Sequence, residues 1–126
     1  MLQFLTDEQI TPDVVVAAKV RCRELSAVSL LHWMDGHFVS ASDEEVLREA
    51  ARQGLTLVSF DLKTIPMLLR KWGERGIDHG GVIFVDVRSF AQNDIGGIAK
   101  ALVDLWNHRG TQDWKNQCFF LTPKGQ

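Results

Sequence analysis

The chain has 126 residues, of which 45% are hydrophobic and 24% charged, and its formal net charge is −2. This length suits one domain, residues 1–126, with a sizeable core, and the charge balance argues against a general nucleic-acid coat protein, which is usually basic. No apolar run approaches the roughly 20 residues that a membrane-spanning helix needs, and Asp7 and Glu8 interrupt the first apolar stretch, so a secretory signal is not expected.

The first part of the chain alternates between strand-like and helix-like segments. Gln3–Thr6 is predicted to be a short strand, and Pro12 suits the first turn of a helix that begins near Thr11. The residues of this helix expected to face inward are Val15, Val16, Ala18 and Val20. Leu25–Trp33 is rich in β-favouring residues and is predicted to be the second strand, followed by a turn at Asp35–Gly36.

The clearest local motif pairs Ser42 with Glu45, which have the spacing of a capping box, so that each satisfies a backbone N–H group at a helix start. The helix that follows has apolar residues at helical spacing and is expected to end at Gly54. Leu55–Phe60 is then predicted to be the third strand, and a further helix to begin at Thr64. The apolar residues of this further helix are Met67, Leu68, Leu69 and Trp72.

The last part of the chain continues the alternation. Val82–Val85 is a continuous apolar run, typical of a parallel strand covered on both faces. Ile95–His108 has one apolar stripe and is predicted to be a helix, and Cys118–Leu121 a final strand at an edge. This order favours an α/β fold, a three-layer α/β/α sandwich with a mostly parallel central sheet and right-handed crossovers.

Two further residue types are informative. Cys22 and Cys118 lack the spacing of a metal-binding or redox pair, so we expect buried or partly buried thiols in a cytoplasmic protein. The tryptophans are expected in the core, although Trp114, in a polar stretch, is a candidate to cover a partner surface.

Three aspartates lie at the boundaries of the predicted elements. Asp7 and Asp61 each follow a strand, and Asp43 opens a helix. In an open parallel sheet the carboxyl ends of the strands, and the helices that follow them, meet at one edge. Three carboxylates there would repel one another unless a cation or protons neutralised them. Because hard oxygen ligands suit Mg²⁺ or Mn²⁺, the pattern predicts a divalent-metal site.

Three stretches, Phe4–Glu8, Ala41–Leu47 and Leu57–Asp61, resemble the PIN-like family of small bacterial proteins of unknown function, which is related to the VapC-type toxin ribonucleases. Later stretches that look like a subgroup of this family are Gly80–Asp86, Ile95–Gly97 and Asp113–Asn116. The resemblance covers nearly the whole chain and implies a PIN-like domain.

The resemblance also implies site residues and a reaction. Its acidic positions match Asp7, Asp43 and Asp61, and Ser59 stands where the family usually has threonine, so its hydroxyl would orient a carboxylate. These aspartates would be metal ligands and catalytic residues of an Mg²⁺- or Mn²⁺-dependent ribonuclease that hydrolyses phosphodiester bonds. PIN nucleases usually carry a further glutamate, and the candidates to supply this extra ligand are Glu8, Glu44 and Asp86. Candidates for positioning the substrate backbone are Arg21 and Arg23.

The implied partners are an RNA substrate, an antitoxin-like protein if the chain is the toxin of a toxin–antitoxin pair, and a second copy of the chain. Two other interpretations stay open. One is a catalytically degenerate PIN-like binding module. The other is a receiver-like signalling domain phosphorylated on Asp61, in which Asp7 and Glu8 form the acid pair after the first strand, although Asp86 then stands where a hydroxyl residue is wanted.

Overall fold

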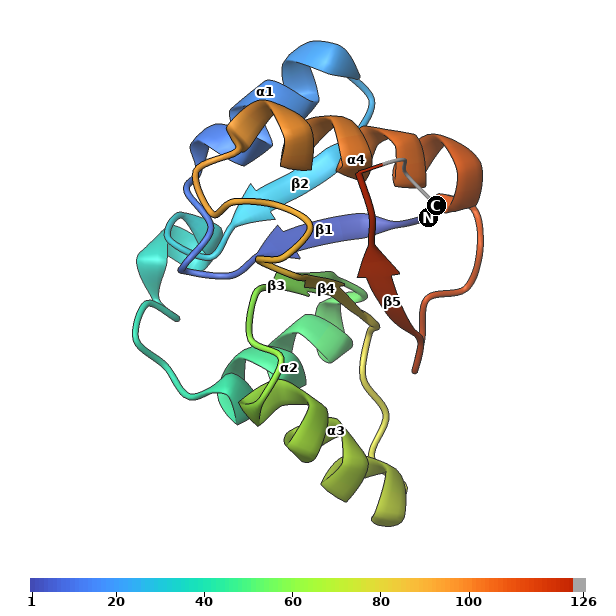
Figure 1. The fold of residues 1–126 in the computed structure, drawn as a ribbon. Coiled ribbons are helices and arrows are strands. Elements are labelled where there is room, and N and C mark those ends of the chain that lie inside the picture. Colours follow the sequence, from blue (N-terminus) through green and yellow to red (C-terminus); the bar gives the residue numbers. More distant parts are fainter. Residues whose placement is uncertain (124–126) are drawn as a thin grey trace.

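The central feature of the fold is one parallel sheet, which we describe in a computed structural model over residues 1–123 (Figure 1). Its spatial strand order is β2-β1-β3-β4-β5, and every neighbouring pair is parallel. The strands are β1 (Gln3–Thr6), β2 (Ser26–Ser29), β3 (Thr56–Ser59), β4 (Val82–Val85) and β5 (Cys118–Leu121). The predicted parallel α/β arrangement is therefore confirmed, including the position of β5 at an edge.

Four α-helices of residues 1–123 cover the two faces of the sheet. They are α1 (Asp13–Arg21), α2 (Asp43–Gln53), α3 (Thr64–Glu74) and α4 (Ile95–Arg109). Helices α1 and α4 lie side by side on one face, and α2 and α3 on the other, which gives the predicted three-layer sandwich (Figure 1). Within this part of the chain, no helix combines the length and the apolar character needed to span a membrane.

The crossover through α4 differs from the prediction of uniformly right-handed connections. The steps from β3 to β4 and from β4 to β5 run in the same direction across the sheet, yet α3 and α4 cover opposite faces. Two parallel crossovers related in this way have opposite hands, so the connections through α3 and α4 cannot both be right-handed. The position of α4 beside α1 has a physical reason, because α4 buries Ile83 and Val85 on a sheet face that α1 alone would leave partly open.

The alternation of side chains along the strands creates two cores and orients the strand ends. Phe4 and Val58 belong to the core under α1 and α4, whereas Leu5 and Leu57 belong to the core under α2 and α3. Because successive strand residues point to opposite faces, Ser59 follows Leu57 onto the α2–α3 side of the sheet. Strand geometry thus directs the hydroxyl of Ser59 toward the side where α2 and α3 begin.

Several predicted boundaries and faces are corrected by the packing. In α1 the buried residues are Val14 and Ala18, whereas Val16 is 60% and Val20 78% exposed. The packing of α1 against α4 decides which side of the helix is buried, and a run of consecutive valines does not indicate that side. The predicted second strand was too long: β2 ends at Ser29, and Trp33 begins a short 3₁₀ turn, η1 (Trp33–Gly36).

The later segments show similar corrections. In α3, Ile65 and Trp72 are the buried residues and Met67 is exposed. Trp114 does not cover a surface. It is buried, and its indole N–H donates to the Arg109 carbonyl oxygen at 3.0 Å.

Candidate functional site

The candidate site lies at the carboxyl edge of the two central strands. From β1 the chain passes to β2 on one side and then returns to β3 on the other side, so the strand order reverses between β1 and β3. Such a reversal opens a crevice beyond the strand ends, and ligands of open α/β sheets bind there. Asp7 and Asp61 follow these two strands, and the backbone N–H of Asp7 extends the pairing by donating to the Val58 carbonyl at 2.9 Å.

A cavity of about 200 Å³ occupies this crevice. Its acidic lining residues are Asp7, Glu8, Asp43 and Asp61, and the remaining ones are Gln9, Leu30, Ala41 and Val46. The structure therefore brings the three predicted aspartates together, from the ends of β1 and β3 and the start of α2. It also places Glu8, one of the three further candidate ligands, at the same cavity.

Ser59 connects two of these aspartates. Its hydroxyl donates to Asp7 Oδ2 at 2.7 Å, and its oxygen accepts the backbone N–H of Asp61 at 3.0 Å. The side chain is buried, so its position is fixed by the surrounding sheet. Ser59 thus holds the Asp7 carboxylate in one orientation, as predicted for a hydroxyl at this position.

Asp61 has a structural role as well. Its Oδ1 accepts the backbone N–H groups of Lys63 at 2.9 Å and Thr64 at 2.8 Å, at the start of α3. Such bonds satisfy donors that have no partner within the helix. Among residues 1–123, no donor hydrogen-bonds to the other carboxylate oxygen, Oδ2, so one oxygen of Asp61 is left for a ligand.

Asp43 is the carboxyl with the most unfavourable surroundings. It is the first residue of α2, after a complete capping box in which the Ser42 hydroxyl accepts the Glu45 N–H and the Glu45 carboxylate accepts the Ser42 N–H. Partial burial raises the pKa of Asp43 above its ordinary value, and the negative charges of Asp7 and Asp61 raise it further. Each of these effects disfavours the charged form of a carboxyl group.

No ion pair with a basic side chain of the described residues offsets this accumulation of negative charge. Within residues 1–123, neither lysine nor arginine forms an ion pair with Asp7, Asp43 or Asp61. Oxygen donors without a counter-charge are the kind of ligand that a hard divalent cation prefers.

The carboxylates surround the cavity without forming a tight cage. In the described part of the chain, no three His, Cys, Asp or Glu side chains form a group that could hold a metal ion by itself. Mg²⁺ commonly uses one or two protein carboxylates and keeps several water ligands. The donor set therefore fits a hydrated cation, with Asp7 and Asp61 as the residues that would hold it.

Two of the further acidic candidates and the two arginines lie elsewhere. Glu44 pairs with Arg48 at 2.7 Å, and Asp86 pairs with Arg88 at 2.6 Å, and neither acid lines the cavity. Arg21 ends α1 and Arg23 precedes β2, which places both at the opposite edge of the sheet. The structure does not bring these two arginines to the candidate site.

Two basic residues beside the candidate site were not among those predicted from the sequence to position the substrate. Lys63 and Lys71 line a groove of about 520 Å³ that shares Asp43 with the carboxylate cavity. Lys63 lies directly before α3, two residues after Asp61, and this proximity was the available signal. Lys71 carried no such signal, because only the orientation of α3 against α2 brings it near Asp43.

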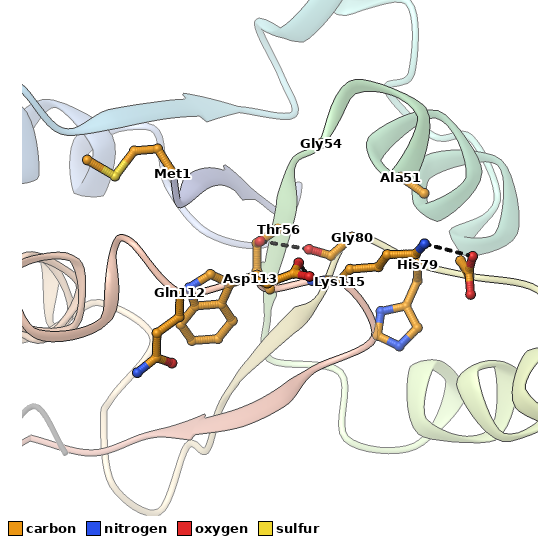
Figure 2. A pocket seen from close by; sticks show the side chains of 11 residues that line it. Met1, Ala51, Gly54, Thr56, His79, Gly80, Gln112, Asp113 and Lys115 are labelled. Carbon is orange, nitrogen blue, oxygen red and sulfur yellow. Dashed lines mark hydrogen bonds and ion pairs between the residues drawn. The ribbon is translucent and has the colours of Figure 1, made fainter.

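A separate cavity of about 270 Å³ lies at the opposite edge of the sheet (Figure 2). Its polar groups are satisfied by one another: Lys115 pairs with Asp78 at 3.2 Å, and the Thr56 hydroxyl donates to the Gly80 carbonyl at 2.8 Å. His79 accepts the Gly81 N–H on Nδ1 at 3.0 Å, and burial lowers the pKa of its imidazole. These groups hold the loops before β4 and β5 together, which is a structural role.

Comparison with family models, curated protein sequences and solved structures found no match to this chain. The functional argument therefore rests on the chemistry and geometry of the site.

Proposed function

We propose that this protein is an Mg²⁺- or Mn²⁺-dependent nuclease that hydrolyses phosphodiester bonds, with RNA as the substrate. The observation that supports this most directly is the gathering of Asp7, Asp43 and Asp61 around one cavity at the switch point of a parallel sheet, where no basic side chain of residues 1–123 forms an ion pair with them. The resemblance of the same residues to the acidic positions of the PIN-like family supports the choice of reaction.

Each residue of the candidate site would have a separate role in the reaction. A bound divalent cation would supply polarisation of the phosphate and a lower pKa for a coordinated water. Asp7 and Asp61 would hold the cation, and the Ser59 hydroxyl keeps Asp7 in position. Asp43, whose pKa is raised by burial and by its acidic neighbours, is the carboxyl of the three best suited to take up a proton.

The test is cleavage of a labelled single-stranded RNA in Mg²⁺ or Mn²⁺ by the wild type and by Asp7→Asn and Asp61→Asn. Asparagine can still accept the hydrogen bonds that Ser59, Lys63 and Thr64 donate, so both variants should fold. The matched control is Asp13→Asn, an exposed acid in the first turn of α1 that does not line the cavity. We expect activity to fall at least about 100-fold in the two site variants and to persist in the control.

Equal rates in the wild type and both site variants would contradict the nuclease proposal. If the purified protein binds RNA without cleaving it, and Asp7→Asn weakens this binding, the result would instead support the degenerate binding module. The proposed toxin role has its own test, because expression of the wild type, but not of Asp7→Asn, should then arrest growth, and an antitoxin-like partner should relieve the arrest.

A second candidate function, a receiver-like phosphorylated domain, is favoured by one observation. The strand order β2-β1-β3-β4-β5 is shared by receiver-like domains, and it places the acid pair Asp7 and Glu8 beside Asp61. Against it, Asp61 Oδ1 already accepts two backbone N–H groups, and Asp86 pairs with Arg88. The lysine that would complete such a site, Lys124, lies outside the described residues. A stable acyl phosphate on Asp61 after incubation with acetyl phosphate and Mg²⁺ would favour this alternative.

A further inference from the structure

A groove of about 520 Å³ lies beside the candidate site, between the start of α2 and the exposed face of α3. Its lining comes from Ser42, Asp43 and Glu44 on α2 and from Lys63, Thr64, Met67, Leu68 and Lys71 at and along α3. Asp43 lines both this groove and the carboxylate cavity, so the two adjoin. A chain-like ligand with a reacting group at the carboxylates would therefore extend into the groove.

The two lysines of the groove carry charges that the protein does not neutralise. Within residues 1–123, Lys63 and Lys71 form no ion pair, whereas the nearby Arg48 and Arg70 pair with glutamates of their own helices. Lys63 and Lys71 are eight residues apart in the sequence, roughly two helical turns. Both side chains are exposed. Their spacing offers two separate points of contact for an anionic polymer.

The groove also presents apolar surface between the two charges. Met67 is 63% exposed, and Leu68 is partly buried next to it. A flexible thioether and an aliphatic side chain can pack against the flat face of an unpaired base. In a double helix the faces of the bases are stacked on one another and cannot contact the protein. Two lysines with apolar surface between them therefore fit a single strand better than a duplex.

We propose that this groove holds the part of a single-stranded RNA that adjoins the phosphate at the carboxylate cavity. Lys63 and Lys71 are the positioning residues for its backbone phosphates, and Met67 contacts a base. The choice of RNA rests on the proposed function, but the location of the strand rests on the groove, its charge and its apolar floor. The proposal replaces Arg21 and Arg23, which lie at the other edge of the sheet.

The experiment measures binding apart from cleavage. A fluorescein-labelled single-stranded RNA is titrated with protein in EDTA, and anisotropy is followed over a range of salt concentrations. The variants are Lys63→Glu, Lys71→Glu and the double variant, and the matched control is Lys19→Glu, an exposed and unpaired lysine of α1 on the opposite face of the sheet. We expect the double variant to bind about 10-fold or more weakly, with the slope of log Kd against log salt reduced by about 1.4, as two lost phosphate contacts require.

The proposal would be overturned by equal affinity of the wild type and the double variant, by an equal loss in Lys19→Glu, or by no binding of the wild type at about 100 μM protein in low salt. Tighter binding of the matching RNA duplex would also overturn it. Lysine-dependent binding without any cleavage in Mg²⁺ or Mn²⁺ would support the groove and contradict only the nuclease proposal, so the two failures can be told apart.

Discussion

The hydroxyl of Ser59 donates to Asp7 Oδ2 at 2.7 Å across 52 residues of sequence. The pairing of β1 with β3 makes this contact possible, because it brings the ends of the two strands to the same height in the sheet. Since Ser59 also accepts the Asp61 N–H, one buried side chain links the carboxylate of Asp7 to the backbone of Asp61.

Replacing Ser59 with alanine should weaken both the fold and the site. The change removes a hydrogen bond to a charged acceptor and leaves the Asp61 N–H without its partner, so we expect the free energy of unfolding to fall by about 1.5–3 kcal/mol. Metal affinity or cleavage should fall roughly 10–100-fold, as for other residues that orient ligands. Urea unfolding and RNA cleavage measure the two effects. Ser59→Thr should restore most of the activity, and full activity in Ser59→Ala would show that the contact is dispensable.

Divalent cations should stabilise the wild type. A cation that binds only the folded chain raises the free energy of unfolding by RT ln(1 + [L]/Kd), so the midpoint of thermal unfolding should rise steadily with Mg²⁺ or Mn²⁺ concentration. The increase should be largely lost in Asp7→Asn and retained in Asp13→Asn, whose side chain does not line the cavity. The midpoint is measured by differential scanning fluorimetry over a range of Mg²⁺ or Mn²⁺ concentrations, and series in Ca²⁺ and Na⁺ serve for comparison. An identical rise in all three proteins would mean that the cation acts elsewhere.

The charge of Asp43 should make stability depend on pH. Its pKa is raised in the folded chain, so between its ordinary value of 3.8 and the raised value the folded chain binds more protons than the unfolded chain. Stability must then fall as pH rises through this window, and the penalty is complete above the raised pKa. Asp43→Asn removes the penalty, so the free energy of unfolding of this variant in EDTA should increase relative to that of the wild type as the pH rises from 3.8 through the raised pKa. A difference that stays constant over this range, measured by urea unfolding, would argue against the repulsion.

Thr6 offers a test of burial that is independent of function. It is fully buried at the end of β1, and its hydroxyl has no hydrogen-bond partner among residues 1–123. Thr6→Val keeps the branched shape and removes this hydroxyl, so the free energy of unfolding should rise by about 1 kcal/mol. The matched control is Thr56→Val, which should lower it, because the Thr56 hydroxyl donates to the Gly80 carbonyl at 2.8 Å. Loss of stability in Thr6→Val would mean that the hydroxyl has a partner, such as a buried water.

Local patterns in the sequence determined much of the fold. The bounds of β1, β4 and β5 agree with the prediction, because short apolar runs between turn residues leave few alternatives. The start and end of α2 also agree, since the Ser42–Glu45 capping box and the left-handed Gly54 act within a few residues of chain. The expectation that acids at strand ends meet at one edge needed only the parallel arrangement of the sheet, and that arrangement followed from the alternation of elements.

Long-range packing decided the rest. The arrangement of α1 and α4 on one face of the sheet decides three features: the buried side of α1, the opposite hand of the α4 crossover and the short β2. No local sequence pattern indicates this arrangement. At the candidate site, the acidic residues were predicted from the sequence, whereas the groove lined by lysines was not. Only the orientation of α3 brings Lys71 to the same groove as Asp43. Local hydrogen bonds and side-chain alternation are encoded by neighbours in the chain, whereas the surroundings of a charge depend on segments that meet only in the folded molecule.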